Sequence, residues 1–273
     1  SRFQSICDSF SIKCRYFQEP FRDFSYSRTR SVEETLRNYD NSFCDFILLL
    51  DGDMELRFDD NFRNEDFSSY DCISFVQRSF SKNTEDFKDS DIEYYNIRLL
   101  STKVHWVCSV PTHEFWERDS FDGKIPISER KCICHYPNYQ SKPAKNYECK
   151  SFWIKDIGDG GCKNDKFERD IRLLTKFLSC HKTLTCPRYS RASFYLARSY
   201  RNLNDYKNSN KYYKIRCSNK DLMDEVYISY EEMGHNYKAM YKIGISILSI
   251  IERLISEGNS LMPTKMDPNR KSY

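Results

Sequence analysis

The segment Phe46-Ile-Leu-Leu-Leu-Asp-Gly-Asp53 joins five consecutive apolar residues to two carboxylates. The apolar run predicts a strand buried on both faces, as in a parallel sheet covered by helices. Asp51 and Asp53 follow the carboxyl end of that strand, where open α/β sheets bind ligands, and such oxygen ligands can hold Mg²⁺ or Mn²⁺. Gly52 lets a phosphate or sugar approach the backbone closely. Asp-Gly-Asp also suits a simple turn, so both interpretations stay open for this motif alone.

Composition and charge narrow the class of protein. Over 273 residues, 43 basic and 40 acidic side chains leave a net charge of +3, which gives no electrostatic footprint for duplex nucleic acid. No apolar run reaches the length of a membrane-spanning helix, and the N-terminal Ser-Arg-Phe-Gln lacks the apolar core of a signal peptide. We therefore expect a cytoplasmic protein that binds no nucleic acid and spans no membrane.

The twelve cysteines are spread from Cys7 to Cys217, far more thinly than in small disulfide scaffolds. The tightest group is Cys132-Ile-Cys134-His135, with Cys149 further on. A structural zinc site would need a second pair at zinc-finger spacing, which the sequence lacks. The pattern therefore favours reduced thiols with structural roles over zinc.

The chain divides into two regions that differ in their pattern of apolar and polar residues. Up to about Cys134, short apolar runs interrupted by polar segments predict a layered α/β sheet, whereas from about Asp165 apolar residues recur at helical spacing. Two aromatic-rich segments, at 194–200 and 206–213, have the placement of a tetratricopeptide hairpin, which must stack on neighbouring helices. The expected strands are Ser11–Phe17, Phe46–Leu50, Cys72–Val76, Ile97–Leu100, Val104–Cys108 and Phe152–Ile154, and the expected helices are Asp23–Asn38, Phe167–Leu178, Ser193–Tyr200, Tyr206–Cys217, Asp224–Tyr237 and Ala239–Ile255.

A glycine-rich loop, Asp156-Ile-Gly-Asp-Gly-Gly161, precedes the first helix of the second region. Backbone N–H groups at that helix start, with Lys163 and Lys166 beside them, would suit a phosphate. The alternative is an ordinary helix start capped by Asn164 or Asp165, and this segment alone favours the alternative.

Seven segments follow one another in a characteristic order. They are Phe21-Arg-Asp-Phe-Ser-Tyr-Ser-Arg28, Asp51-Gly-Asp53, Tyr95–Leu99, Val104–Trp106, Thr112-His-Glu-Phe-Trp116, the glycine loop with Asp165–Ile171, and Phe194–Tyr200. In this order they resemble glycosyltransferases with the GT-A fold, of the family-2 type with a C-terminal tetratricopeptide region, found in bacteria and giant viruses. The resemblance spans about Cys14 to Gly234. It implies a Rossmann-like domain over residues 1–161 that binds a nucleotide-diphospho-sugar and a helical region over 162–258; we expect a disordered tail over 259–273.

The resemblance also implies roles for single residues. Arg28 would lie near the donor nucleotide with Asp51, which touches the donor's ribose or shares a Mn²⁺ or Mg²⁺ ion. Asp53 would ligate that ion. Glu114, beside His113, would take the acceptor's proton. On the residues alone, His113 could instead be a structural histidine and Glu114 could pair with Arg118 four positions on.

Two departures from the family affect the expected site. A His-Tyr-Gly motif that offers a third metal ligand in related members is replaced by Asp156-Ile-Gly, so Asp156 is the expected ligand, with His135-Tyr-Pro as a rival placement. The first nucleotide-binding strand also lies before Ser1, so we expect an incomplete domain.

Two functions follow from these sequence features. The first is an inverting, metal-dependent transfer from a UDP- or GDP-sugar to an acceptor that the sequence does not identify, be it a glycan, a protein or a small molecule. For a viral member, the transfer would occur in the host cytoplasm. The alternative is a decayed transferase domain that binds a protein through its tetratricopeptide helices. In either case the helical region could hold a homodimer.

Overall fold

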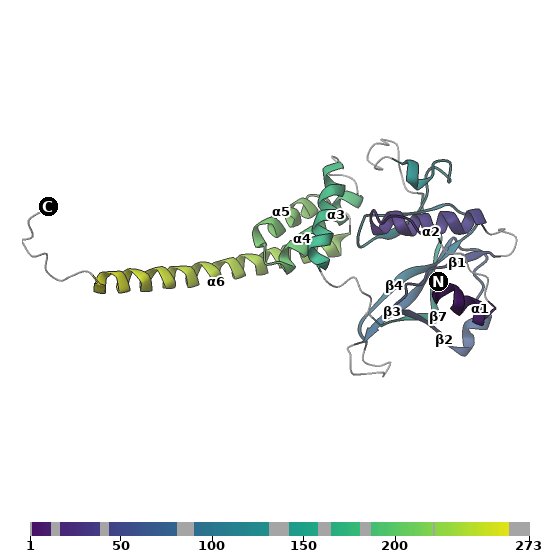
Figure 1. Ribbon diagram of the computed structural model, residues 1–273, viewed down its shortest axis with the longest axis horizontal. Coiled ribbons are helices and arrows are strands. Elements are labelled where there is room, and N and C mark those ends of the chain that lie inside the picture. The colour runs from purple at the N-terminus through teal and green to yellow at the C-terminus, as the bar shows by residue number, and fades with distance from the viewer. Residues whose placement is uncertain are drawn as a thin grey trace, which may run out of the picture. The chain divides into compact units, whose positions relative to one another are not determined.

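A computed structural model describes residues 2–11, 17–38, 44–80, 90–130, 142–157, 165–180, 187–220 and 222–261. The chain divides into two compact units, residues 1–163 and 164–273, called here the sheet unit and the helical unit. The sequence predicted a boundary at 161/162. Each unit is described by itself, and Figure 1 shows their elements.

The sheet unit is built on one mixed five-stranded sheet in the order β1-β4-β3-β7-β2. Only β3 and β7 run parallel, and every other neighbouring pair is antiparallel. The α/β class is therefore confirmed, and the expected parallel sheet is wrong. The strands are β1 (Phe46–Leu48), β2 (Met54–Phe58), β3 (Cys72–Phe80), β4 (Ser90–Ser101) and β7 (Asn146–Asp156).

The apolar run that follows Phe46 does not form a strand buried on both faces. Only Phe46–Leu48 is strand, and it lies at the sheet edge, paired on one side with β4. Leu48 and Leu50 are 42% and 45% exposed, whereas Ile47 and Leu49 pack inward. The prediction failed because an unbroken apolar run does not reveal whether its strand is central or at an edge.

Helix α2 (Phe24–Asn38) covers one face of the sheet. Val32 of this helix packs with Cys72, Leu100 and Trp106. The opposite face has a second core around Ile73, Phe75, Cys149 and Ile154. The predicted helix Asp23–Asn38 is confirmed with Asp23 as its cap, because the Asp23 carboxylate accepts a hydrogen bond of 2.8 Å from the Tyr26 N–H.

A two-stranded sheet of β5 (Trp106–Ser109) and β6 (Phe115–Arg118) packs beside α2. The amide of Cys108 donates to the Thr29 hydroxyl of α2, at 2.8 Å. The remaining elements of this unit are α1 (Arg2–Ser9), η1 (Asp60–Asn64) and η2 (Ile127–Glu129). The expected strand Ser11–Phe17 falls mostly outside the described residues, and its described ends are not strand.

The helical unit consists of consecutive helices that pack in sequence order. They are α3 (Lys166–Cys180), α4 (Pro187–Asn202), α5 (Tyr206–Cys217) and α6 (Met223–Leu261). The first three confirm predicted helices. The two helices expected over 224–255 are one continuous helix, which runs through Gly234 and Asn236, because the Asn236 side chain bonds to Ser209 and Asn210 of α5 and caps no helix end.

Two further observations bear on the predicted class of protein. Among the described residues no helix is long and apolar enough to cross a membrane. Within the described residues, Cys72, Cys108 and Cys149 are buried thiols that form no disulfide. Cys132, Cys134 and His135, and the tail from residue 262, lie outside the described residues.

A buried ion pair offers a test of the sheet unit. Asp119 and Arg130 are almost fully buried, 2.6 Å apart, and Asp119 also accepts from the amide of Gly123. Asp119→Ala leaves the buried Arg130 unpaired, so we expect it to lower the unfolding free energy by about 3 kcal/mol. Denaturant unfolding followed by tryptophan fluorescence measures this, because all three tryptophans lie in the sheet unit.

The matched control is Asp122→Ala, which breaks the exposed pair with Lys142 and should change little. Equal effects of the two substitutions would contradict the assignment of Asp119 as a structural anchor.

Candidate functional site

The Asp-Gly-Asp segment forms a turn that crosses the sheet. Strands β1 and β2 are consecutive in the chain but lie at opposite edges of the sheet, so residues 49–53 must bridge the strands between them. The Leu49 amide donates to the Arg98 carbonyl of β4 at 2.8 Å, and the Ile157 amide donates to the Asp53 carbonyl at 3.0 Å. The Met54 amide closes the turn on the Asp51 carbonyl at 3.1 Å. The turn interpretation is therefore confirmed, and backbone groups close the turn without using either carboxylate.

Arg28 of α2 joins two of the predicted site residues. Its two terminal nitrogens donate to the two carboxylate oxygens of Asp51, at 2.7 and 3.0 Å. Its Nε donates to Glu114 at 2.5 Å. This bidentate geometry fixes the orientation of the Asp51 carboxylate and stabilises its ionised form.

A chain of polar contacts continues beneath the turn, across the middle of the sheet. Arg98 of β4 lies 3.7 Å from Asp51 and donates to Gln77 of β3 at 2.5 Å. Gln77 in turn donates to Asp156 of β7 at 2.9 Å. Glu114, Arg28, Asp51, Arg98, Gln77 and Asp156 thus form one connected set, called here the site network.

Glu114 reaches the site network from the turn between β5 and β6. Val110 and His113 in this turn both have positive φ, +70° and +56°, a conformation that is rare for a β-branched residue such as Val110. Val110 is nevertheless 2% exposed, so packing holds the turn in place. Backbone strain of this kind is concentrated at functional segments.

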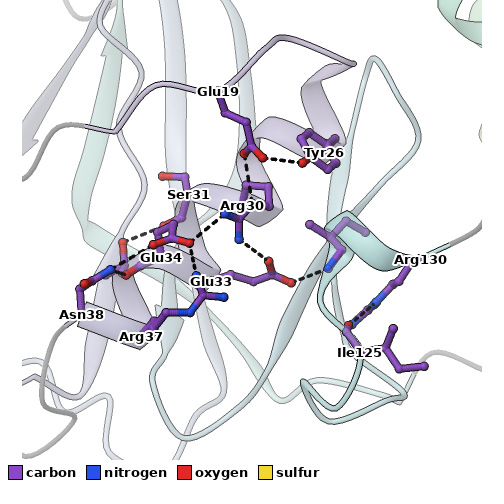
Figure 2. Close-up of polar contacts among 12 residues, drawn as sticks. Glu19, Tyr26, Arg30, Ser31, Glu33, Glu34, Arg37, Asn38, Ile125 and Arg130 are labelled. Carbon is purple, nitrogen blue, oxygen red and sulfur yellow. Dashed lines mark hydrogen bonds and ion pairs between the residues drawn. The ribbon is translucent and has the colours of Figure 1, made fainter.

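Helix α2 is anchored at several points, so Arg28 projects from a fixed element. The Phe24 amide donates to the Pro111 carbonyl at 3.1 Å, which ties the helix start to the β5–β6 turn. Figure 2 shows a cluster of ion pairs in which Arg30 contacts Glu19, Glu33 and Glu34. Glu33 also accepts from the amide of Ile127 at 2.8 Å.

The charges of the site network shift the pKa of Asp51. Burial alone would raise this pKa, but the hydrogen bonds and charge of Arg28, with a contribution from Arg98, lower it below its ordinary value. Arg98 is 4% exposed, and within the described residues its Nε has no hydrogen-bond partner. This burial lowers the pKa of the Arg98 guanidinium. The network therefore keeps Asp51 ionised against a positively charged partner.

The structure brings several of the predicted site residues together within the sheet unit. Arg28, Asp51, Glu114 and Asp156 belong to the site network, and Asp53 adjoins it through the Ile157 amide. Lys166 begins α3 in the helical unit, where its ammonium lies 5.8 Å from the Phe167 ring centroid. His113 belongs to the turn before Glu114, and Lys163 lies outside the described residues.

The carboxylates can be compared with what a divalent cation needs. Within the described part of the chain, no three His, Cys, Asp or Glu side chains form a group that could hold a metal ion. Both carboxylate oxygens of Asp51 accept hydrogen bonds from Arg28. Asp53 immediately precedes strand β2, and Asp156 ends the neighbouring strand β7, where it pairs with Met54. Mg²⁺ is commonly held by one or two carboxylates together with substrate phosphates. Asp51 is therefore committed to the ion pair with Arg28, which leaves Asp53 and Asp156 as the candidate carboxylate ligands.

Sequence reasoning assigned no role to Arg98 or Gln77. Both are buried polar residues in central strands, at 4% and 2% exposure. The available signal was a charged residue inside the apolar run Ile97-Arg-Leu-Leu100, because a buried arginine requires a partner.

Neither the protein-family models nor the curated proteins give a match to this chain.

The lowered pKa of Asp51 predicts a pH-dependent contribution to stability. This contribution is complete above the unfolded-state pKa of about 3.9 and is lost as the pH falls through the lower folded-state pKa. Asp51→Asn should therefore destabilise the sheet unit at pH 7, and the difference from wild type should shrink as the pH falls below about 4. Denaturant unfolding at a series of pH values measures the difference.

Asp45→Asn is the control, since Asp45 pairs with Lys103 on the exposed surface. Its effect should be small at every pH. A difference between wild type and Asp51→Asn that does not change with pH would exclude the ion pair as its source.

Proposed function

We propose that this chain transfers a sugar from a UDP- or GDP-sugar to an acceptor, with a divalent metal ion and inversion at the anomeric carbon. The observation that carries the proposal is the site network: Arg28, Asp51, Glu114 and Asp156 come from four segments spread over 129 positions of the chain, yet one set of contacts joins them. All four had been singled out from the order of sequence motifs.

The finer fold and the cofactor belong to the same proposal. The sheet unit is a GT-A-like nucleotide-diphospho-sugar domain, and the helical unit is a tetratricopeptide-like region. Asp53 and Asp156 would hold Mn²⁺ or Mg²⁺ together with the donor's phosphates. The ion, when bound, neutralises the charge that develops on the leaving diphosphate.

Different side chains of the site network have different roles in the proposed reaction. Arg28 and Asp51 position the donor's ribose and phosphates, because the bidentate pair presents a fixed charge distribution beside the Asp-Gly-Asp turn. The acceptor hydroxyl gives its proton to the Glu114 carboxylate, and its oxygen forms a bond to the anomeric carbon. The bond from that carbon to the diphosphate breaks on the opposite face, and the electron pair leaves with the diphosphate.

Donor binding is the first test. With Mn²⁺ and one of a panel of UDP- and GDP-sugars, the melting temperature of the sheet unit, followed by tryptophan fluorescence, should rise by about 5 °C or more at a hundredfold excess over Kd. Asp53→Ala should abolish the rise, because the metal loses a ligand. Asp59→Ala, on the exposed surface after β2, should keep it. If no donor stabilises the wild-type protein in the presence of metal, the transferase proposal fails.

Turnover with the donor so identified tests the base. Glu114→Gln should lower kcat by about a hundredfold or more while leaving the donor KM unchanged, because a neutral amide cannot accept the proton. Glu117→Gln, on the same small sheet, serves as the control. A Glu114→Gln variant with normal kcat would remove Glu114 from the proposed chemistry.

A protein-interaction module is the second candidate. The observation that favours it is the exposure of large apolar side chains along α6, including Tyr227, Tyr241 and Leu248 at 71%, 70% and 60%. In that case the donor panel gives no metal-dependent stabilisation, whereas a protein that covers α6 raises the stability of the helical unit.

A further inference from the structure

One side of helix α6 packs within the helical unit. Val226, Ser229, Met233 and Asn236 are buried, and the Asn236 amide donates to Asn210 and Ser209 of α5 at 2.8 and 2.9 Å. From Tyr237 to Arg253, none of the described side chains is buried. The helix therefore extends beyond the part that its own unit covers (Figure 1).

A second side of α6 carries a regular apolar stripe. Its positions alternate by four and three residues, which is the spacing of a coiled-coil seam, sustained over four heptads. The larger side chains at these positions are between 45% and 71% exposed. This heptad stripe consists of Met223, Tyr227, Tyr230, Gly234, Tyr237, Tyr241, Gly244, Leu248 and Ile251.

We propose that the C-terminal part of the heptad stripe, from Tyr241 to Ile251, pairs with the same part of a second copy of this chain, as an antiparallel coiled coil centred near Gly244–Ile247. A seam repeating every 3.5 residues supercoils around another helix, so it calls for a helical partner. In an antiparallel pair, the two seams interlock when Tyr241 lies opposite Ile251 of the second copy and Gly244 lies opposite Leu248. A Cβ added at Gly244 would meet no atom within 4 Å, so this position has room for the larger side chain.

The charged residues beside the heptad stripe favour the same register and the antiparallel direction. In that register the flanking Lys238 lies opposite Glu252 of the second copy, and by symmetry the pair occurs twice. A register shifted by one heptad places Glu231 opposite Glu252, which repels. A parallel pair would place the flank that carries the charges (Asp224, Glu231, Lys238, Ile245, Glu252) against an apolar one (Val226, Met233, Met240, Ile247) and would form no flanking ion pair.

The proposal is independent of catalysis, and the oligomeric state of the full chain tests it. Sedimentation equilibrium should show a reversible dimer. Ile251→Lys places a charge in the seam and should weaken dimerisation at least about tenfold. Ile250→Lys is the matched control: it is a neighbouring isoleucine of similar exposure, 51% against 45%, but it lies off the stripe, and it should leave the Kd within about twofold.

Charge reversal tests the direction of the pair. Lys238→Glu and Glu252→Lys should each weaken the dimer by about tenfold, because each places like charges together at two symmetric contacts. The double variant should restore dimerisation, since it exchanges the partners. In a parallel dimer these positions are fourteen residues apart in sequence and no restoration occurs.

Three results would overturn the proposal: a wild-type chain that is monomeric at all concentrations, equal effects of Ile250→Lys and Ile251→Lys, or no rescue in the double variant. A monomer that instead binds phospholipid vesicles through α6 would assign the stripe to a lipid surface.

Discussion

The short connection between two strands at opposite sheet edges governs the architecture of the sheet unit. Residues 49–53 link β1 to β2, and part of that link is a tight turn. A flat five-stranded sheet would separate its edge strands by about 19 Å, before any offset along the strands. Three extended residues followed by one tight turn span only about 18 Å. The two lengths are nearly equal, so the connection has no slack, and a curl of the sheet shortens the distance that the Asp-Gly-Asp turn crosses over strands β4, β3 and β7.

This crossing explains why the site network exists. Asp51 is carried over the central strands, where the buried Arg98 and Gln77 link it to Asp156 on β7. Two acidic residues, Asp51 and Glu114, then face one guanidinium from α2. Because Arg28 satisfies both, the position of the β5–β6 turn is coupled to that of the Asp-Gly-Asp turn. A ligand that competes for Asp51 would act on both turns at once.

The helical unit has the opposite character, because its ordering is local. Each helix packs on the next, and the turn before α5 is set by Asn204, with φ of +60°, and by Asp205, which accepts from the Asn208 amide at 3.1 Å. Helix α6 continues past its own packing and leaves a seam in heptad spacing. Local periodicity could predict this helix, but its continuity through Gly234 and Asn236 depended on packing, since the Asn236 side chain bonds to Ser209 and Asn210 of α5.

The sequence by itself determined the α/β class, the helix after Asp23, most of the strands and the helical second half, because these depend on periodicity and capping within short windows. It also singled out Arg28, Asp51, Glu114 and Asp156. Tertiary structure alone decided that β1 is an edge strand, that only β3 and β7 are parallel, and that Arg98 and Gln77 connect the site. Strand order and the partners of buried charges depend on contacts between residues distant in sequence, which local sequence patterns do not predict.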